Sequence, residues 1–354
     1  MAQTRRPPVR VGIVGLGRAG LQMHGPELQQ MPEMFQVIGA CDLIKERRDM
    51  AIQQFPRCRN FRTFEDMLHD PDIELIDICT PSINHVPMAL QALKLKRWVN
   101  VERPFCLDFN QATILRAASL NAGNRLLVRH NYRYEPAFVQ TREIIESGIL
   151  GPVYDIKIRR GQFRRRDDWQ TLKSCGGGAC MAWGPAFFDQ ALLLLGSQPF
   201  KVFSEFKRVA SVGDAEDYMR VVMRNNLGLT VDLEISGGRV GMDPMFCVTG
   251  EKGEWRYYEG APEGMLRILD PSVKLPRRRS SVRTPPLGSF GTEESLSWLD
   301  QTVPIAPKGR AGMSVIWEDV YNQIRGNVPY PVSMDSTMET MRLLCLMLKD
   351  SNYA

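Results

Sequence analysis

The sequence lacks a long apolar run, a regular cysteine spacing and a large net charge. Without a continuous apolar stretch of about 20 residues, we expect no membrane partner and no signal peptide, which makes the cytoplasm the expected location. Eight unevenly spaced cysteines are typical of reduced thiols, and no second Cys/His pair joins Cys175 and Cys180, so we expect no metal site. A net charge of +5, without aromatic residues interleaved on a basic face, argues against a nucleic-acid partner.

The composition, 44% hydrophobic and 24% charged over 354 residues, is typical of a globular protein with room for two domains. In residues 1–129, short β-rich runs alternate with helical patterns, which predicts an α/β domain built on a parallel sheet. The expected strands are Arg10–Val14, Gln36–Cys41, Leu75–Cys79, Trp98–Val101 and Leu126–Arg129. The expected helices are Ala19–Gln30, Lys45–Gln54, Phe64–Leu68, Val86–Leu95 and Asn110–Asn121.

Residues 130–354 have a different pattern, in which successive strands are separated by turn residues. This predicts a second, α+β domain with a large, mostly antiparallel open sheet. Its expected strands are Val153–Phe163, Lys201–Val209, Asp217–Arg224, Leu229–Ile235, Met245–Thr249, Glu254–Tyr258 and Met265–Leu269. Its expected helices are Pro136–Ser147, Pro185–Leu195, Gly312–Arg325 and Met334–Lys349.

The segment Gly15-Leu-Gly17-Arg-Ala-Gly20 follows the first strand and opens a helix. Gly15 permits a tight turn, Gly17 lets the backbone approach a pyrophosphate, and Gly20 allows close packing of helix and strand. Asp42 ends the second strand, where a carboxylate would bind the ribose of a dinucleotide. The pattern predicts a dinucleotide site, with NAD favoured because Asp42 would repel a 2′-phosphate. Arg47 and Arg48 nearby leave NADP as the alternative.

Several further motifs occur in a fixed order along nearly the whole chain. They are Thr80-Pro81 with His85, Glu102-Arg103-Pro104, Asn131-Tyr-Arg-Tyr134, Trp169, Gly176-Gly-Gly178, Gly184 with Asp189, and Gly326-Asn-Val-Pro-Tyr-Pro-Val332. With the glycine motif, they make the chain resemble the Gfo/Idh/MocA oxidoreductases. The resemblance implies a Rossmann domain, a second domain for substrate and subunit contacts, and hydride exchange between NAD(P) and a sugar or polyol. It also implies a homodimer or homotetramer, with which apolar positions in Leu229–Ile235 are compatible.

The motifs and the resemblance together assign the candidate site residues. The cofactor residues are Gly15, Gly17, Arg18, Ala19, Gly20, Asp42, Thr80, Pro81, His85, Glu102, Arg103 and Asn131. Those for the substrate are Arg133, Arg166, Trp169, Ala186 and Asp189, and the catalytic candidates are Arg103, His130, Tyr132 and Asp189. Thr80, His85 and Glu102 would hold the nicotinamide and its ribose, and Arg103 would orient the substrate.

The chain departs from the family pattern at three positions that handle the substrate proton in similar enzymes. Arg103 replaces a lysine, Ala182 an aspartate and Ala186 a histidine. Oxidation of an alcohol needs a base for the hydroxyl proton, and an arginine does not deprotonate. His130 and Tyr132 are the candidate substitutes, although a hinge histidine and a packed tyrosine are equally compatible with the pattern. Asp189 is implied to be structural or substrate-binding.

Arg164, Arg165 and Arg166 precede the triple glycine and are either solvated or part of a cationic cleft with Arg103 and Arg133. A cationic cleft would suit an anionic substrate such as a sugar acid or sugar phosphate. Three functions remain open on these residues. They are an NAD(P)-dependent oxidoreductase with a non-standard proton relay, a catalytically silent dinucleotide-binding sensor or partner subunit, and redox-neutral chemistry with a recycled cofactor.

Overall fold

The computed structural model describes residues 6–275, 279–280, 282–284, 287 and 296–353. One sheet has six parallel strands in the order β3-β2-β1-β4-β5-β6. Its strands are β1 (Val9–Val14), β2 (Phe35–Cys41), β3 (Arg59–Phe61), β4 (Leu75–Ile78), β5 (Trp98–Val101) and β6 (Leu126–Val128). The strand order reverses between β1 and β4, and ligands of open parallel sheets bind at the carboxyl edge of such a reversal. The predicted Rossmann domain is confirmed.

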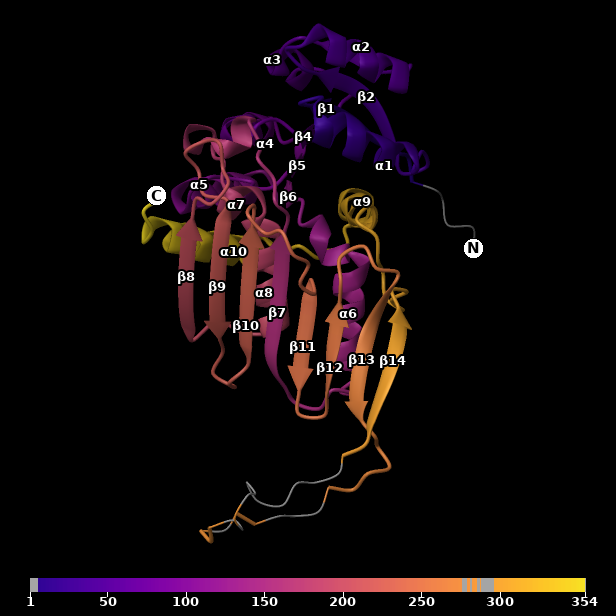
Figure 1. The fold of residues 1–354 in the computed structure, drawn as a ribbon. Helices are drawn as coiled ribbons and strands as arrows, with labels where there is room; N and C mark the ends of the chain where they lie inside the picture. Colours follow the sequence, from indigo (N-terminus) through magenta and orange to yellow (C-terminus); the bar gives the residue numbers. More distant parts are fainter. Residues whose placement is uncertain (1–5, 276–278, 281, 285–286, 288–295, 354) are drawn as a thin grey trace, which may run out of the picture.

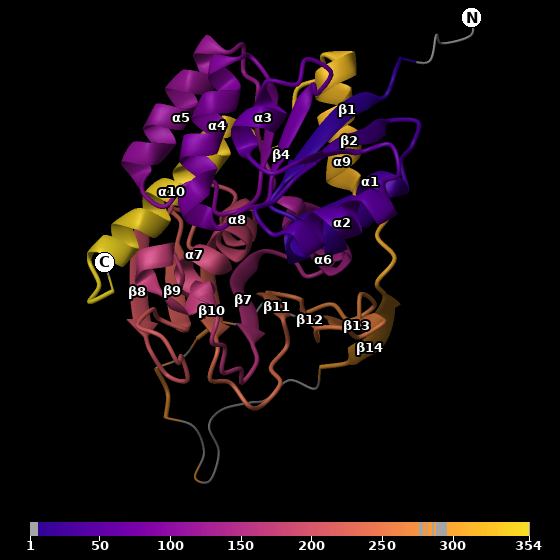
Figure 2. The same cartoon turned by 90° about the horizontal axis from the view of Figure 1, so that it is seen from above.

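Helices cover both faces of this parallel sheet (Figure 2). They are α1 (Gly25–Gln29), α2 (Lys45–Gln54), α3 (Phe64–Leu68), α4 (His85–Lys94) and α5 (Phe109–Asn121). The predicted helix Ala19–Gln30 is divided into a π-helical segment, Arg18–His24, and α1, whose second residue is Pro26. In Figure 2, α4 and α5 lie on one side of the sheet and α1 on the other.

The other sheet has eight strands in the order β14-β13-β12-β11-β7-β10-β9-β8. Only β7 and β10 are parallel neighbours, so the prediction of a mostly antiparallel sheet is confirmed. The strands are β7 (Val153–Gly161), β8 (Lys201–Lys207), β9 (Tyr218–Arg224), β10 (Thr230–Ser236), β11 (Phe246–Gly250), β12 (Gly253–Tyr257), β13 (Glu263–Leu269) and β14 (Trp298–Pro304). β14 was not among the expected strands.

One face of the large sheet is covered by helices and the other is open (Figure 1). The covering helices are α6 (Pro136–Glu146), α8 (Gly184–Leu195) and α10 (Met334–Lys349), and the short α7 (Ala179–Ala182) precedes α8. Val231, Leu233 and Ile235 are buried in the core. Because they are buried within this chain, they are not available for the subunit contacts with which their apolar character was compatible. Asp232, which lies between these positions on β10, pairs with Arg159 and Arg220. The oligomeric state stays a prediction.

Two features of the second half bear on its boundaries. The segment Lys173–Leu195 is apolar and long enough to cross a membrane by composition, but 78% of its window is buried inside the protein, as in a core helix. Helix α9 (Val315–Tyr321) packs against the parallel sheet, with the ring of Trp317 5.5 Å from that of Phe35. The division at residues 129 and 130 remains a prediction. Helix α9 belongs to the second part of the chain but packs against the sheet of the first part.

Candidate functional site

The glycine motif forms a tight turn between β1 and the π-helical segment. Gly15 has φ +89°, and a Cβ there would lie 2.6 Å from the carbonyl carbon of Cys79 and the nitrogen of Thr80. A Cβ on Gly20 would lie 2.3 Å from the Gly15 oxygen. Gly17, by contrast, has only the Arg47 guanidinium nearby, at 4.0 Å. The protein itself thus requires glycine at 15 and 20, whereas glycine at 17 leaves open space for a ligand to approach the backbone.

Asp42 is held rigidly beside this turn. Its carboxylate accepts hydrogen bonds from the backbone N–H of Leu16 at 2.8 Å and of Ile44 at 2.9 Å. The Arg47 guanidinium lies 3.5 Å from the carboxylate. Asp42, Arg47 and Arg62 line the same cavity of about 740 Å³ as the glycine turn. We call this space the nucleotide cavity.

The loops after β4 and β5 form the other wall of the nucleotide cavity. Thr80, Pro81 and His85 line it, as does Glu102. The two ring nitrogens of His85 lie 2.7 Å from the Pro104 oxygen and 2.8 Å from the Thr80 oxygen. Burial lowers the pKa of His85. Because each nitrogen faces a backbone carbonyl, His85 joins the two loops and has no nitrogen free for the cleft.

A buried charge network lies behind Glu102. His24 is 2.8 Å from the Asp77 carboxylate and 3.1 Å from the Glu102 carboxylate. Burial alone would lower the pKa of His24, but Asp77 and Glu102 raise it. Burial likewise opposes ionisation of Glu102, yet the hydrogen bond from His24 and the charge of Arg103 lower its pKa to about 2. Glu102 therefore stays ionised at any physiological pH.

Three atoms of this network lie close enough together to hold a metal ion. They belong to His24, Asp77 and Cys79, and all lie within 4.8 Å of one another. The His24 ring already lies 2.8 Å from Asp77 and 3.2 Å from the Cys79 sulfur. Because these groups are partners of one another, the geometry supports a hydrogen-bonded cluster, and the absence of a metal site stays a prediction.

Arg103 follows β5 in the first domain, and its side chain contacts the second domain. Its guanidinium donates a hydrogen bond to the Ala182 oxygen at 2.9 Å and lies 4.9 Å from the ring of Tyr132 and 5.4 Å from that of Trp183. Arg103, Ala182 and Trp183 all line the nucleotide cavity. Arg103 is thus a cation held against two aromatic rings, at the position where the resemblance implied a lysine.

Several predicted site residues lie outside the nucleotide cavity and the cavity that adjoins it. Asp189 is buried and pairs with both ends of the Arg133 guanidinium, at 2.7 and 2.6 Å. His130 lies 3.7 Å from Asp189, and burial lowers its pKa to about 4. Tyr132 packs edge-on against Trp183 and Phe187. None of His130, Asn131, Tyr132, Arg133, Ala186 and Asp189 lines either cavity named here.

Other predicted residues do meet at the nucleotide cavity. Arg18, Ala19, Arg166 and Trp169 line it together with the turn glycines Gly15 and Gly17. Arg166 also pairs with Asp168 in the same loop. The second domain therefore contributes one wall of the cavity through the loop before the triple glycine, and substrate binding by Arg166 and Trp169 stays a prediction.

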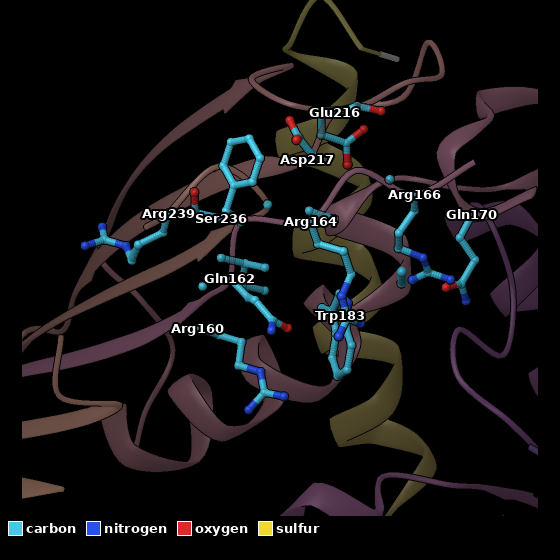
Figure 3. A pocket seen from close by; sticks show the side chains of 18 of the residues that line it. Arg160, Gln162, Arg164, Arg166, Gln170, Trp183, Glu216, Asp217, Ser236 and Arg239 are labelled. Atoms are coloured by element: carbon cyan, nitrogen blue, oxygen red, sulfur yellow. The ribbon is translucent and has the colours of Figure 1, made fainter. Parts of the chain in front are cut away.

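A second cavity, of about 680 Å³, adjoins the nucleotide cavity (Figure 3). The two share Arg18, Arg166, Gln170, Ala182 and Trp183. We call the second one the arginine cavity, because Arg160, Arg164 and Arg239 line it as well. Figure 3 shows Glu216 and Asp217 towards one end of it and Arg160 and Trp183 towards the other. Arg160, Glu216 and Arg239 were missed from the sequence, where no motif marks them.

Comparison with known proteins gives the family. The model of an oxidoreductase family with an NAD-binding Rossmann fold matches residues 9–130, and that of the GFO/IDH/MocA C-terminal domain matches residues 138–256. The chain belongs to the Gfo/Idh/MocA family of oxidoreductases. It is an NAD(P)-binding oxidoreductase, and the open Gly17 backbone, Asp42 and Glu102 fit such a cofactor.

Curated proteins and a solved structure match along nearly the whole length. The oxidoreductase YdgJ of Escherichia coli is 29% identical over 98% of this chain and 97% of its own. IolW of Bacillus subtilis, a scyllo-inositol 2-dehydrogenase (NADP(+)), is 25% identical over 95% of this chain and 92% of its own. The structure of an NAD-binding protein from Listeria innocua has a TM-score of 0.80 at 20% identity, covering 95% of this chain and 92% of that one.

Proposed function

We propose that this oxidoreductase exchanges a hydride between NAD(P) and a small polyol-like substrate that carries a negative charge, such as a sugar acid or sugar phosphate. The observation that carries the proposal is the arginine cavity, where five arginines face three carboxylates. When bound, the nicotinamide supplies the hydride chemistry. The protein supplies the binding, and the shared wall at Ala182 and Trp183 brings substrate and nucleotide together. The inositol dehydrogenases among its relatives support a polyol skeleton.

Three of the five arginines of the arginine cavity have an ion-pair partner. Arg160 pairs with Glu259, Arg166 with Asp168, and Arg239 with Glu234. Arg164 makes no ion pair or side-chain hydrogen bond with any residue that the structure describes. Burial, and also the charge of Arg164, lowers the pKa of Arg160. An anionic substrate would relieve this repulsion, because a guanidinium binds a carboxylate or phosphate through two hydrogen bonds.

The proposed function is tested by turnover. We would supply the purified protein with NAD+ or NADP+ and with myo-inositol, scyllo-inositol, D-gluconate, D-glucuronate or D-glucose 6-phosphate, and follow nicotinamide absorbance. We expect the anionic compounds to react with the higher kcat/KM. Nucleotide binding without turnover of any of them would favour a silent sensor. Product formation without an absorbance change would favour redox-neutral chemistry.

The Arg164→Ala variant should distinguish charged from neutral substrates. We expect KM for an anionic substrate to rise about 10- to 100-fold with little change in kcat, since a hydrogen bond to a charged group contributes about 1.5–3 kcal/mol. KM for a neutral polyol should stay nearly constant. Steady-state kinetics provide the measurement, with the exposed Arg142→Ala on α6 as control. Equal effects on charged and neutral substrates would count against an anionic substrate.

Asp42 should set the preference between NAD and NADP. Asp42→Asn removes the negative charge but keeps an acceptor for the Leu16 N–H. We expect NAD+ to bind about tenfold more weakly and NADP+ more tightly, because the Arg47 guanidinium, now 3.5 Å from the carboxylate, remains beside residue 42. Calorimetric titration of both nucleotides measures the shift. An unchanged ratio of the two dissociation constants would mean that Asp42 does not face the ribose.

A further inference from the structure

The proposed function needs a proton acceptor that the usual family positions do not supply. Transfer of a hydride from an alcohol carbon leaves a hydroxyl proton that must be removed. Arg103 cannot deprotonate, and Ala182 and Ala186 have no titratable group. The inference below rests on the proposed function and concerns where this proton goes.

The titratable groups of the nucleotide cavity are unsuited to the task. Glu102 is ionised but has a pKa of about 2, so it is a very weak base. His85 has both nitrogens at backbone carbonyls. Asp42 is occupied by two backbone N–H groups, and Asp168 pairs with Arg166. An acceptor must therefore be sought in the adjoining arginine cavity.

Three carboxylates line the arginine cavity, and two of them are already engaged. Glu259 pairs with Arg160. Asp217 accepts the backbone N–H groups of Val209 at 2.6 Å and Ala210 at 2.8 Å. Glu216 makes no ion pair with any residue in the described part of the chain, and its carboxylate accepts one hydrogen bond from another residue, the Cys180 N–H at 2.8 Å.

The surroundings of Glu216 are shaped for its carboxyl group. The residue is only 3% exposed, and a Cβ on Gly178 would lie 2.4 Å from both carboxyl oxygens. Its backbone oxygen accepts the N–H of Ala179 at 2.8 Å, so Glu216 is fixed at the start of α7. Ala182, at the other end of α7, binds Arg103 through its oxygen. The short helix α7 therefore contacts Glu216 at its first residues and ends at Ala182, which lines both cavities.

We propose that Glu216 is the catalytic residue that accepts the substrate hydroxyl proton. In the oxidation, the carbinol C–H bond breaks and its electron pair leaves as hydride to the nicotinamide ring. The O–H bond breaks, its electrons form the carbonyl π bond, and its proton passes to the Glu216 carboxylate. Glu216 then releases the proton to water. In the reverse direction, protonated Glu216 would donate its proton to the carbonyl oxygen, with the hydride supplied by the reduced cofactor when one is bound.

The charges around Glu216 suit a proton that is taken up and released near neutral pH. Burial raises its pKa to about 7, although the N–H groups of Cys180 and of Glu216 itself, and the charge of Lys173, act in the opposite direction. Asp217 raises the pKa further. The buried Cys180 thiol remains neutral because its own pKa is raised well above the ordinary value. The cations that line the same cavity are Arg18, Arg160, Arg164, Arg166 and Arg239.

The Glu216→Gln variant tests the proposal, because glutamine keeps an acceptor for the Cys180 N–H but cannot take a proton. With the best substrate of the panel above, we expect kcat for oxidation to fall about 100- to 10,000-fold while KM and the NAD+ dissociation constant change little. In wild type, kcat for oxidation should rise with pH and level off above about 7, and this dependence should be lost in the variant. Glu205→Gln, on the exposed β8 strand, is the matched control.

Two measurements need no substrate. Carbon NMR of labelled glutamate should show one carboxyl titrating near pH 7 that is absent in Glu216→Gln. Since the folded pKa exceeds the ordinary 4.5, stability should fall as the pH rises from about 4.5 to 7 in wild type but not in the variant. If the wild type turns over a substrate and kcat of Glu216→Gln is within threefold of the wild-type value, the assignment of Glu216 is wrong while the proposed function stands. The absence of a carboxyl group that titrates near pH 7 would also overturn the assignment of Glu216. Absence of wild-type turnover on the whole panel would overturn the proposed function and this inference with it.

Discussion

Replacing Asp189 with alanine should lower the free energy of unfolding by about 3–5 kcal/mol, as for other broken buried ion pairs. The Asp189 side chain is 3% exposed and that of Arg133 12%. Removal of the carboxylate leaves the guanidinium buried with only the Ser336 hydroxyl at 2.9 Å and the Pro331 oxygen at 3.3 Å. These contacts join the segment after β6 to α8 and α10, so the loss should loosen the packing of these elements on one another. Urea unfolding followed by circular dichroism measures the change.

The double variant Arg133→Met with Asp189→Leu is the matched control. Removing both charges avoids an unpaired buried ion, so most of the lost stability should return. The same pair of variants decides whether Asp189 belongs to the catalytic machinery. If Asp189→Ala unfolds like the wild type but loses turnover, the carboxylate acts on the substrate and the structural role given to it here is wrong.

The Rossmann half was predictable because its signals are local. Glycine is required at position 20 by the backbone oxygen of Gly15, and at position 15 by backbone atoms at the end of the neighbouring strand β4. Asp42 follows a strand that periodicity identifies. The expected strands end at the same edge of the sheet, so Thr80 and Glu102 were correctly expected near one another. Missed elements had weak patterns. β3 is only three residues long, and β14 is exposed along most of its length.

The direction of side chains in the second domain could not be predicted from spacing. Ala186 and Asp189 share one side of α8, but that helix is buried nearly all round, so its periodicity does not show which side meets the cavity. The structure places this side against Arg133 and His130 instead. Glu216 lies in a loop before β9, and only tertiary packing brings it to α7. Such a residue has no sequence signal beyond its being a carboxylate.

Alanine in place of Gly20 should mainly lower stability, whereas alanine in place of Gly17 should mainly weaken nucleotide binding. A methyl group at Gly20 would lie 2.3 Å from the Gly15 oxygen, which is backbone and cannot move aside cheaply. We expect Gly20→Ala to cost about 3 kcal/mol or more of stability. A methyl group at Gly17 meets only the exposed Arg47 guanidinium at 4.0 Å, and the backbone there has φ −87°, which any residue adopts. Gly17→Ala should therefore change stability by no more than about 0.5 kcal/mol.

The same Gly17→Ala variant should nevertheless bind NAD+ at least about tenfold more weakly, since its methyl group would occupy the space through which a pyrophosphate reaches the backbone N–H groups. Urea unfolding and calorimetric titration with NAD+ and NADP+ together measure the two effects. The contrast separates a glycine that the protein needs for its own packing from one that only a bound nucleotide needs. A Gly17→Ala protein that binds both nucleotides as tightly as the wild type would show that no diphosphate lies against this turn.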